Sequence, residues 1–190
     1  MVFLGNPLVA QSVEQLPFKE MVVGSIPTGR TMDSSKSAIL ILPDIRSALN
    51  VGALFRSSDA VGIDKIFLTG YTPCPTDSFG RIQKDIQKSA LGAESWIDWE
   101  YKKTLLPLIK KLKRESYNIV ALEQDKRSVD YRKFKTFKKI AFIIGSEVEG
   151  LDKKILDQCD SILEIPMYGK KESLNVSVAT GIALFRILKP

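Results

Sequence analysis

Short, largely apolar runs alternate with amphipathic stretches along most of the chain. The runs have the length and composition of buried strands, and they predict β-strands at residues 38–42, 65–69, 96–99, 118–122, 140–144 and 162–165. Helical spacing predicts helices at residues 50–62, 81–90, 102–115, 153–158 and 174–188. The third helix begins either at residue 102 or at Pro107, because proline is tolerated only in a helix's first turn. This alternation predicts an α/β domain with a mainly parallel sheet and helices on both faces.

Three of these strands run into polar turns, at residues 43–50, 145–151 and 166–173. Ligands of parallel sheets bind beyond the carboxyl ends of the strands, so we expect the protein's chemistry in these turns. In the first turn, Asn50 is expected to cap the following helix, and Gly52 allows a backbone or a phosphate to come close. Asn50 and Arg56 then both point toward the start of the helix. The alternative is a capping Asn50 and a solvated or ion-paired Arg56.

The second turn places acidic residues between Gly145 and Gly150. Its glycine spacing is similar to that of a phosphate loop, but no Lys-Ser/Thr pair follows and the acids would repel phosphate. The turn therefore suits a neutral or cationic ligand, or else it is an ordinary helix start with acids on the helix dipole. In the third turn, Ser173 is expected to cap the last helix, with Asn175 in its first turn.

Composition removes several classes of function. The 190 residues include no histidine, which excludes histidine-based triads, histidine general bases and histidine-ligated zinc. Cys74 and Cys159 are too few for a zinc site, and we interpret them as reduced thiols, with no metal expected. No apolar run approaches the roughly 20 residues of a membrane span, and the N-terminus lacks a signal-peptide pattern. We therefore expect a cytoplasmic protein.

Residues 1–31 differ from the rest, because they have no clear period and contain several glycines and prolines. The codons GGT TCG ATT CC, which look like the T-arm of a tRNA gene, can encode the segment that starts at Gly24. The leader is then either read-through of upstream DNA, with a native start at Met32, or a genuine flexible tail. Both readings leave residues 32–190 as the folded domain.

The net charge of +6 favours a polyanionic partner such as nucleic acid. The excess is concentrated at residues 126–139, which hold seven basic side chains and one acidic side chain. Tyr131, Phe134 and Phe137 are interleaved with them. The segment is either an RNA-binding surface with stacking groups or a solvated loop whose aromatic side chains turn into the core.

Taken together and in this order, the three turns resemble the three motifs of the SpoU/TrmH family of RNA ribose methyltransferases, within the SPOUT class. The first match is Asn50-x-Gly52-x-x-x-Arg56, the second is Gly145-Ser146-Glu147 with Gly150-Leu151, and the third is Ile165-Pro166-Met167-x-Gly169 with residues 173–179. The third match is the longest and most specific. The resemblance covers residues 38–188, so residues 32–190 resemble a SpoU-type methyltransferase domain.

This resemblance implies an α/β domain with a deep C-terminal trefoil knot, which binds S-adenosylmethionine in the knot. It also implies a homodimer, in which Arg56 of one subunit meets the cofactor of the other, and 2′-O-ribose methylation of tRNA or rRNA. The implied catalytic residues are Asn50, Arg56, Glu147, Ser173 and Asn175. The implied cofactor-binding residues are Gly145, Ile165, Met167, Gly169, Ser173 and Leu174.

The family proposal makes the Arg56 equivalent a general base, but an arginine side chain stays protonated in proteins. Arg56 is better suited to grip the adjacent phosphate at two points and to stabilise the developing alkoxide. For the rest of the RNA we favour Arg81, Lys84 and Lys88, whose spacing predicts one helix face, although a plain solvated face fits as well. The loop at residues 71–80 is a candidate for target choice.

The sequence leaves two other functions to consider. A non-catalytic RNA-binding or ribosome-assembly module is the main alternative, but binding alone does not need Arg56, Glu147 and the 173–175 segment together. A dinucleotide-dependent oxidoreductase is disfavoured because no GxGxxG follows the first strand.

Overall fold

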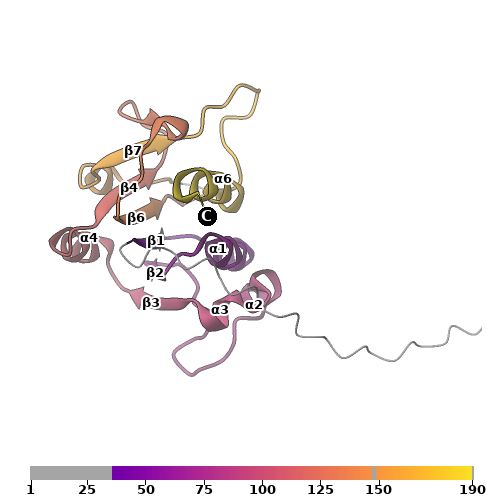
Figure 1. Ribbon diagram of the computed structural model, residues 1–190. Helices are drawn as coiled ribbons and strands as arrows, with labels where there is room; N and C mark the ends of the chain where they lie inside the picture. Colours follow the sequence, from indigo (N-terminus) through magenta and orange to yellow (C-terminus); the bar gives the residue numbers. More distant parts are fainter. Residues whose placement is uncertain (1–35, 147–148, 190) are drawn as a thin grey trace, which may run out of the picture. The chain divides into compact units, whose positions relative to one another are not determined.

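A sheet of seven strands forms the centre of the computed structural model, which describes residues 36–146 and 149–189 (Figure 1). Every pairing between these strands is parallel, and their order is β3-β2-β1-β6-β4-β7-β5. The strands are β1 (Ser37–Pro43), β2 (Lys65–Thr69), β3 (Asp98–Lys102), β4 (Asn118–Leu122), β5 (Val129–Asp130), β6 (Lys139–Ile144) and β7 (Ser161–Glu164). The predicted leader and its boundary at Met32 lie outside the described residues.

Helices cover both faces of the sheet (Figure 1). One face carries α1 (Ala48–Val61), α2 (Lys84–Ala90), α3 (Ala93–Trp96) and α6 (Val176–Leu188), and the other carries α4 (Leu105–Arg114) and α5 (Lys153–Leu156). Alternate residues of β1 serve the two faces: Leu40 packs with the first group, whereas Ile41 packs with the second. The predicted parallel α/β architecture with helices on both faces is confirmed.

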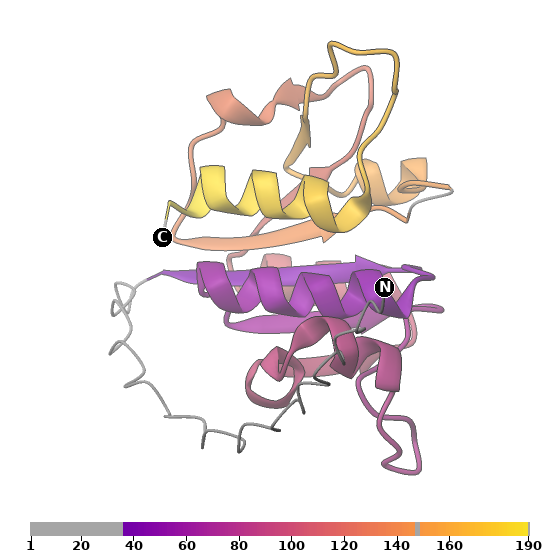
Figure 2. The same ribbon diagram turned by 90° about the vertical axis from the view of Figure 1, so that its right-hand side faces the viewer.

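Figure 2 shows α1 and α6 side by side, with the arrowheads of neighbouring strands pointing in the same direction. The turns that follow β1, β6, β4 and β7 therefore lie together at the carboxyl ends of the strands, because these strands are neighbours and parallel. Within residues 36–146 and 149–189, none of the helices is both long and apolar enough to cross a membrane.

The starts of two functional helices differ from the prediction. Helix α1 is capped by Ser47, whose hydroxyl accepts a hydrogen bond from the Asn50 N–H at 3.3 Å, so Asn50 lies in the first turn and is not the cap. Helix α6 is capped by Asn175, whose side chain accepts from the Ser177 N–H at 2.9 Å, so Ser173 lies before the helix. In both cases a nearby polar side chain competes successfully for the cap position.

Three further boundaries were misplaced. Helix α2 begins at Lys84, so Arg81 lies in the preceding loop and the predicted helix face shared by Arg81, Lys84 and Lys88 is wrong. Helix α4 begins at Leu105, which leaves Pro107 in the first turn, where no backbone donor is needed. Strand β3 begins at Asp98, because the preceding residues form the short helix α3.

Gly52 brings two helices close together. A Cβ at this position would lie 2.0 Å from Ser89 Oγ and 2.4 Å from the Ile86 carbonyl oxygen, both in α2. The residue is buried in α1. Of the two uses that the sequence allows for Gly52, the structure shows the approach of another backbone.

Two aromatic side chains and two arginines of the basic segment at residues 126–139 take part in the fold. Tyr131 and Phe134 pack against the core, as the solvated-loop reading expects, whereas Phe137 stays partly exposed beside Phe134. Arg132 pairs with Asp130, and its hydrogen bonds lower the pKa of that carboxyl to about 2. Arg127 pairs with two further carboxylates.

Candidate active site

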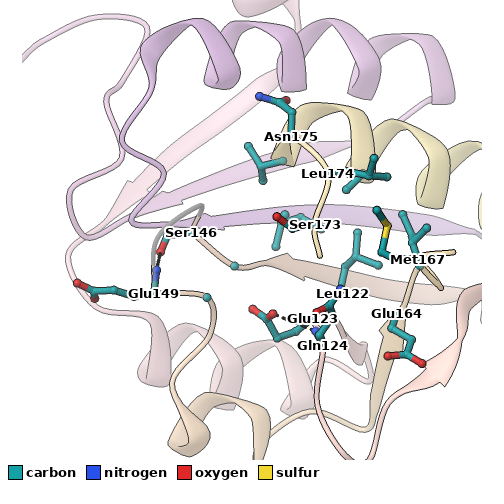
Figure 3. A pocket seen from close by; sticks show the side chains of 16 residues that line it. Leu122, Glu123, Gln124, Ser146, Glu149, Glu164, Met167, Ser173, Leu174 and Asn175 are labelled. Carbon is teal, nitrogen blue, oxygen red and sulfur yellow. Dashed lines mark hydrogen bonds between the residues drawn. The ribbon is translucent and has the colours of Figure 1, made fainter. Parts of the chain in front are cut away.

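A cavity of about 620 Å³ opens at the carboxyl ends of β4, β6 and β7, beside the segment that leads into α6 (Figure 3). The turns after β6 and β7, both predicted to carry chemistry, form two of its walls. The lining residues are Leu122, Glu123, Gln124, Ile144, Gly145, Ser146, Glu149, Gly150, Glu164, Ile165, Met167, Ser173, Leu174, Asn175, Val176 and Ala179.

Most of the residues predicted to bind a cofactor line this cavity. They are Gly145, Ile165, Met167, Ser173 and Leu174. Gly169 is absent from the lining, and a Cβ built on it would meet no described atom of the protein within 4 Å. Its proposed contact with a ligand therefore stays a prediction.

The first and third motifs meet at one hydrogen bond, although 125 residues separate them. The Asn175 Oδ1 atom accepts from the backbone N–H and the hydroxyl of Ser177, at 2.9 and 2.6 Å. These bonds orient the amide so that its Nδ2 group donates to Asn50 Oδ1 at 3.2 Å. Asn50 is thereby held beside the cavity although it does not line it.

Two other predicted catalytic residues stand apart from this contact. Glu147 lies outside the described residues, so its role stays a prediction. Arg56 is exposed in the middle of α1, is not part of the cavity lining, and has no ion-pair partner within the described part of the chain. One subunit alone therefore does not bring Arg56 to the cavity wall.

Glu123, which follows β4 and lines the cavity, was not predicted from the sequence. Its Oε2 atom accepts a hydrogen bond from the Leu151 N–H at 2.9 Å, and its Oε1 atom accepts from the Gln124 N–H at 2.9 Å. A Cβ on Gly145 or Gly150 would lie 2.4 or 2.6 Å from Oε2. These two glycines therefore make room for the Glu123 carboxylate, which ties the second-motif turn to β4.

Gln124, also missed, joins the same wall to the third motif. Its side-chain amide donates to the Glu172 carbonyl oxygen at 2.7 Å. In the sequence, the one feature that points to these two residues is that a polar Glu-Gln pair directly follows a buried strand. This pair is recognised as part of the site only once the strand order is known, because that order places β4 between β6 and β7.

Among the residues that the structure describes, the cavity lining carries acidic side chains and no basic ones. Its carboxylates belong to Glu123, Glu149 and Glu164. Glu149 is largely exposed and forms an ion pair with Arg46 at 3.5 Å. Such a site favours a cationic or neutral ligand over a phosphate, as the acids in the second turn predicted.

The residues predicted to bind RNA lie on and before α2. Lys84 and Lys88 are exposed and four residues apart in that helix, so they share a face. Arg81 is in the preceding loop, where its Nε atom forms an ion pair with Asp77 at 2.6 Å. The loop and α2 follow β2, next to β1 in the sheet.

Comparison with known proteins agrees with this arrangement. A tRNA (guanosine(18)-2'-O)-methyltransferase of Aquifex aeolicus is 31% identical over 150 residues, covering 79% of this chain and 68% of that protein. The crystal structure of the A. aeolicus TrmH/SpoU tRNA modifying enzyme superposes with a TM-score of 0.71 at 28% identity, covering 81% of this chain and 75% of that one. The AdoMet-bound rRNA methyltransferase from Sinorhizobium meliloti gives 0.70 at 27% identity, covering 79% and 55%.

A Staphylococcus haemolyticus protein assigned to the TrmH family of tRNA/rRNA methyltransferases is 28% identical over 153 residues. That match covers 80% of this chain and 59% of the relative, so the chain spans about three-fifths of the length of that protein. The sequence model of the SpoU rRNA Methylase family matches residues 37–185, which include all three motif turns. Together with the parallel sheet and the cavity built from those turns, this match shows that the chain belongs to the SpoU rRNA methylase family.

Proposed function

We propose that this protein transfers a methyl group from S-adenosylmethionine to the 2′-hydroxyl of a ribose in tRNA or rRNA. The observation that carries the proposal is the acidic cavity at the ends of β4, β6 and β7, bordered by the hydrogen-bonded pair Asn50 and Asn175. The AdoMet-bound relative from S. meliloti supports the choice of cofactor.

The residues of the cavity fit this cofactor. A volume of about 620 Å³ is within the range of small-molecule sites, roughly 300–1,000 Å³. Leu122, Ile165 and Leu174 offer apolar surface for an adenine ring. The carboxylates of Glu123 and Glu164 complement the positive sulfonium and ammonium groups. When bound, S-adenosylmethionine supplies an electrophilic methyl group, which an in-line displacement transfers without a metal.

The protein's own residues then prepare the ribose. We assign to Asn50, whose side chain accepts a hydrogen bond from Asn175, the role of holding the ribose-phosphate at the mouth of the cavity. Arg56 grips the adjacent phosphate with its planar fork and stabilises the alkoxide that forms as the 2′-hydroxyl loses its proton. The guanidinium is already protonated and cannot take this proton, so the general base is a group other than Arg56, such as the substrate phosphate.

We further propose that the active form is a homodimer. The exposed side of α6 carries Val178, Ile182 and Phe185, which are spaced as one helical stripe. Helix α6 packs beside α1, the helix that carries Arg56. A second copy of the chain on this stripe covers the apolar side chains and brings Arg56 to its partner's cavity. We also propose that the chain forms the deep C-terminal knot that the family resemblance implies.

The first test is calorimetric titration with S-adenosylmethionine. Wild-type protein is expected to bind it, and Gly169→Val is expected to lose binding while its circular dichroism stays unchanged. The added side chain meets no described protein atom nearby, so a loss of affinity reports contact with the ligand. Absence of binding by the wild type favours a non-catalytic RNA-binding module. Unaltered affinity in Gly169→Val contradicts the assignment of this residue.

The second test is mass-spectrometric mapping of ribose methylation in RNA from cells with and without the gene. One or more 2′-O-methyl nucleotides are expected to disappear on deletion and to return with the wild-type gene. An unchanged map contradicts the proposed reaction.

A further inference from the structure

The loop between β2 and α2 presents large aromatic side chains to solvent. Tyr71 is 90% exposed and Phe79 is 81% exposed, while Tyr101 of the neighbouring strand β3 is 45% exposed and lies against the Gly70 backbone, next to Tyr71. The loop projects from the sheet and helices in Figures 1 and 2. The proposed methyl transfer uses none of these rings. Several exposed apolar groups in one region indicate an interaction site, whereas scattered ones do not.

The tip of this loop is held in a fixed shape by Asp77. Its carboxylate accepts hydrogen bonds from the N–H groups of Phe79 and Arg81, at 2.8 and 2.9 Å, and pairs with Arg81 Nε at 2.6 Å. The backbone hydrogen bond from Arg81, followed by the one from its side chain, lowers the pKa of Asp77. Gly80 adopts a φ of 76°, which closes the turn. Phe79 is therefore exposed on an organised turn.

One cation lies over the exposed ring, and two more follow it along the chain. The guanidinium carbon of Arg81 lies 5.2 Å from the centroid of Phe79, and Lys84 and Lys88 follow on the exposed face of α2. A flat aromatic surface beside basic groups is the arrangement with which proteins bind single-stranded nucleic acid, since bases stack on the rings while cations contact phosphates. A base inside a duplex is already stacked on its neighbours and cannot use the ring.

The loop is also fastened to the active-site turn. The Tyr71 N–H donates to Asp44 Oδ1 at 2.9 Å, and Asp44 belongs to the first-motif turn that leads to Asn50. The Tyr101 hydroxyl donates to the Gly70 carbonyl oxygen at 3.0 Å. A second cavity, of about 790 Å³, lies between the loop and β3 and is lined in part by Arg81, Gln83 and Tyr101.

We infer that residues 71–83 form a base-stacking platform, which holds an unpaired nucleobase of the RNA substrate on Phe79 while Arg81 and Lys84 contact the neighbouring phosphates. The inference rests on the proposed RNA methyltransferase function and adds the substrate feature that the chain recognises. The platform selects RNA with an unpaired base near the methylated ribose.

The test measures fluorescence anisotropy of labelled 12-nucleotide oligo(A), oligo(U) and a 12-base-pair RNA duplex with the full-length protein. Wild type is expected to bind oligo(A) more tightly than oligo(U), because purines offer the larger stacking surface. Phe79→Ala is expected to weaken oligo(A) binding at least about fivefold and to remove the preference for purine, given the usual size of base–aromatic stacking. Phe79→Tyr is expected to bind like wild type, and duplex binding is expected to stay unchanged.

Phe137→Ala is the matched control, since Phe137 is an exposed phenylalanine of the more basic segment at residues 126–139. It is expected to bind oligo(A) like wild type. The inference is overturned if Phe79→Ala binds like wild type, if only Phe137→Ala weakens binding, or if wild type binds none of the single strands.

The failure of this inference is distinguishable from that of the proposed function. If Phe79→Ala still methylates RNA and binds the oligonucleotides like wild type, the stacking platform is contradicted and the proposed reaction stands. If the wild-type protein binds oligo(A) through Phe79 but methylates no RNA, the stacking platform stands and the proposed reaction is contradicted.

Discussion

At the scale of single residues, two substitutions of Arg56 distinguish its positive charge from the planar geometry of its guanidinium. Arg56→Lys keeps the positive charge but loses the planar fork, whereas Arg56→Ala loses both. If Arg56 grips the phosphate and stabilises the alkoxide, we expect Ala to lower the single-turnover methylation rate about 100- to 1,000-fold and Lys to fall between Ala and wild type. The measurement uses saturating S-adenosylmethionine, whose affinity is expected to be unchanged in both variants. A near-wild-type rate for Arg56→Ala contradicts the catalytic assignment.

Glu123 provides a second prediction at this scale. Glu123→Gln keeps the size of the side chain but removes the charge that faces Leu151 N–H and the two glycines of the second-motif turn. Hydrogen bonds to charged groups contribute about 1.5–3 kcal/mol, so we expect the dissociation constant for S-adenosylmethionine to rise roughly tenfold or more. Calorimetry measures this constant. The matched control is Glu172→Gln, an exposed carboxylate outside the cavity lining; equal affinity in the two variants contradicts a role for Glu123.

At the scale of elements, the packing of α1 on α2 depends on Gly52. Gly52→Ala places a Cβ 2.4 Å from the Ile86 carbonyl oxygen, and backbone at that distance must move. We expect a loss of about 1–3 kcal/mol in the free energy of unfolding, as is usual when a packed interface is overfilled. Chemical denaturation followed by circular dichroism measures it.

Gly181→Ala in α6 is the control for the same exchange. There the new Cβ meets only Ser57 Oγ, at an ordinary 3.8 Å, and alanine favours the helix by about 1 kcal/mol. We expect this variant to be as stable as wild type or more so. If both variants lose the same stability, close packing at Gly52 is not the cause.

At the scale of the whole molecule, the proposed dimer brings Arg56 of one subunit to the cavity of the other. Ile182→Glu puts a charge into the apolar stripe of α6, where Ile182 is 38% exposed. We expect light scattering to show a fall from about twice 21.2 kDa to 21.2 kDa, together with loss of methylation.

Val129→Glu alters an exposed apolar residue of β5 and is expected to leave the dimer and the activity unchanged. An active Ile182→Glu monomer contradicts both the α6 interface and the sharing of Arg56 between subunits.

The sequence by itself determined most of the elements and the motif residues, but not the short elements α3 and β5. Apolar runs at residues 38–42, 118–122 and 140–144 predicted strands correctly, because continuous apolar runs of this short length are typical of strands buried on both faces of a parallel sheet. The turns after residues 144 and 165 were also predicted to carry chemistry, since polar and glycine residues directly after buried strands have no role in the core, and both turns line the cavity. Helix starts were less certain, because Ser47 competed with Asn50, and Asn175 with Ser173, for the caps.

Only the tertiary structure decided which of these turns lie together around the cavity. The order of the strands in the sheet depends on how the crossover helices pack, and this packing has no local signal in the sequence. It places β4 between β6 and β7 and so brings Glu123 against Gly145 and Gly150. The hydrogen bond between Asn50 and Asn175 has the same origin, since it joins residues 125 positions apart whose side chains meet only when α1 and α6 lie together on one face.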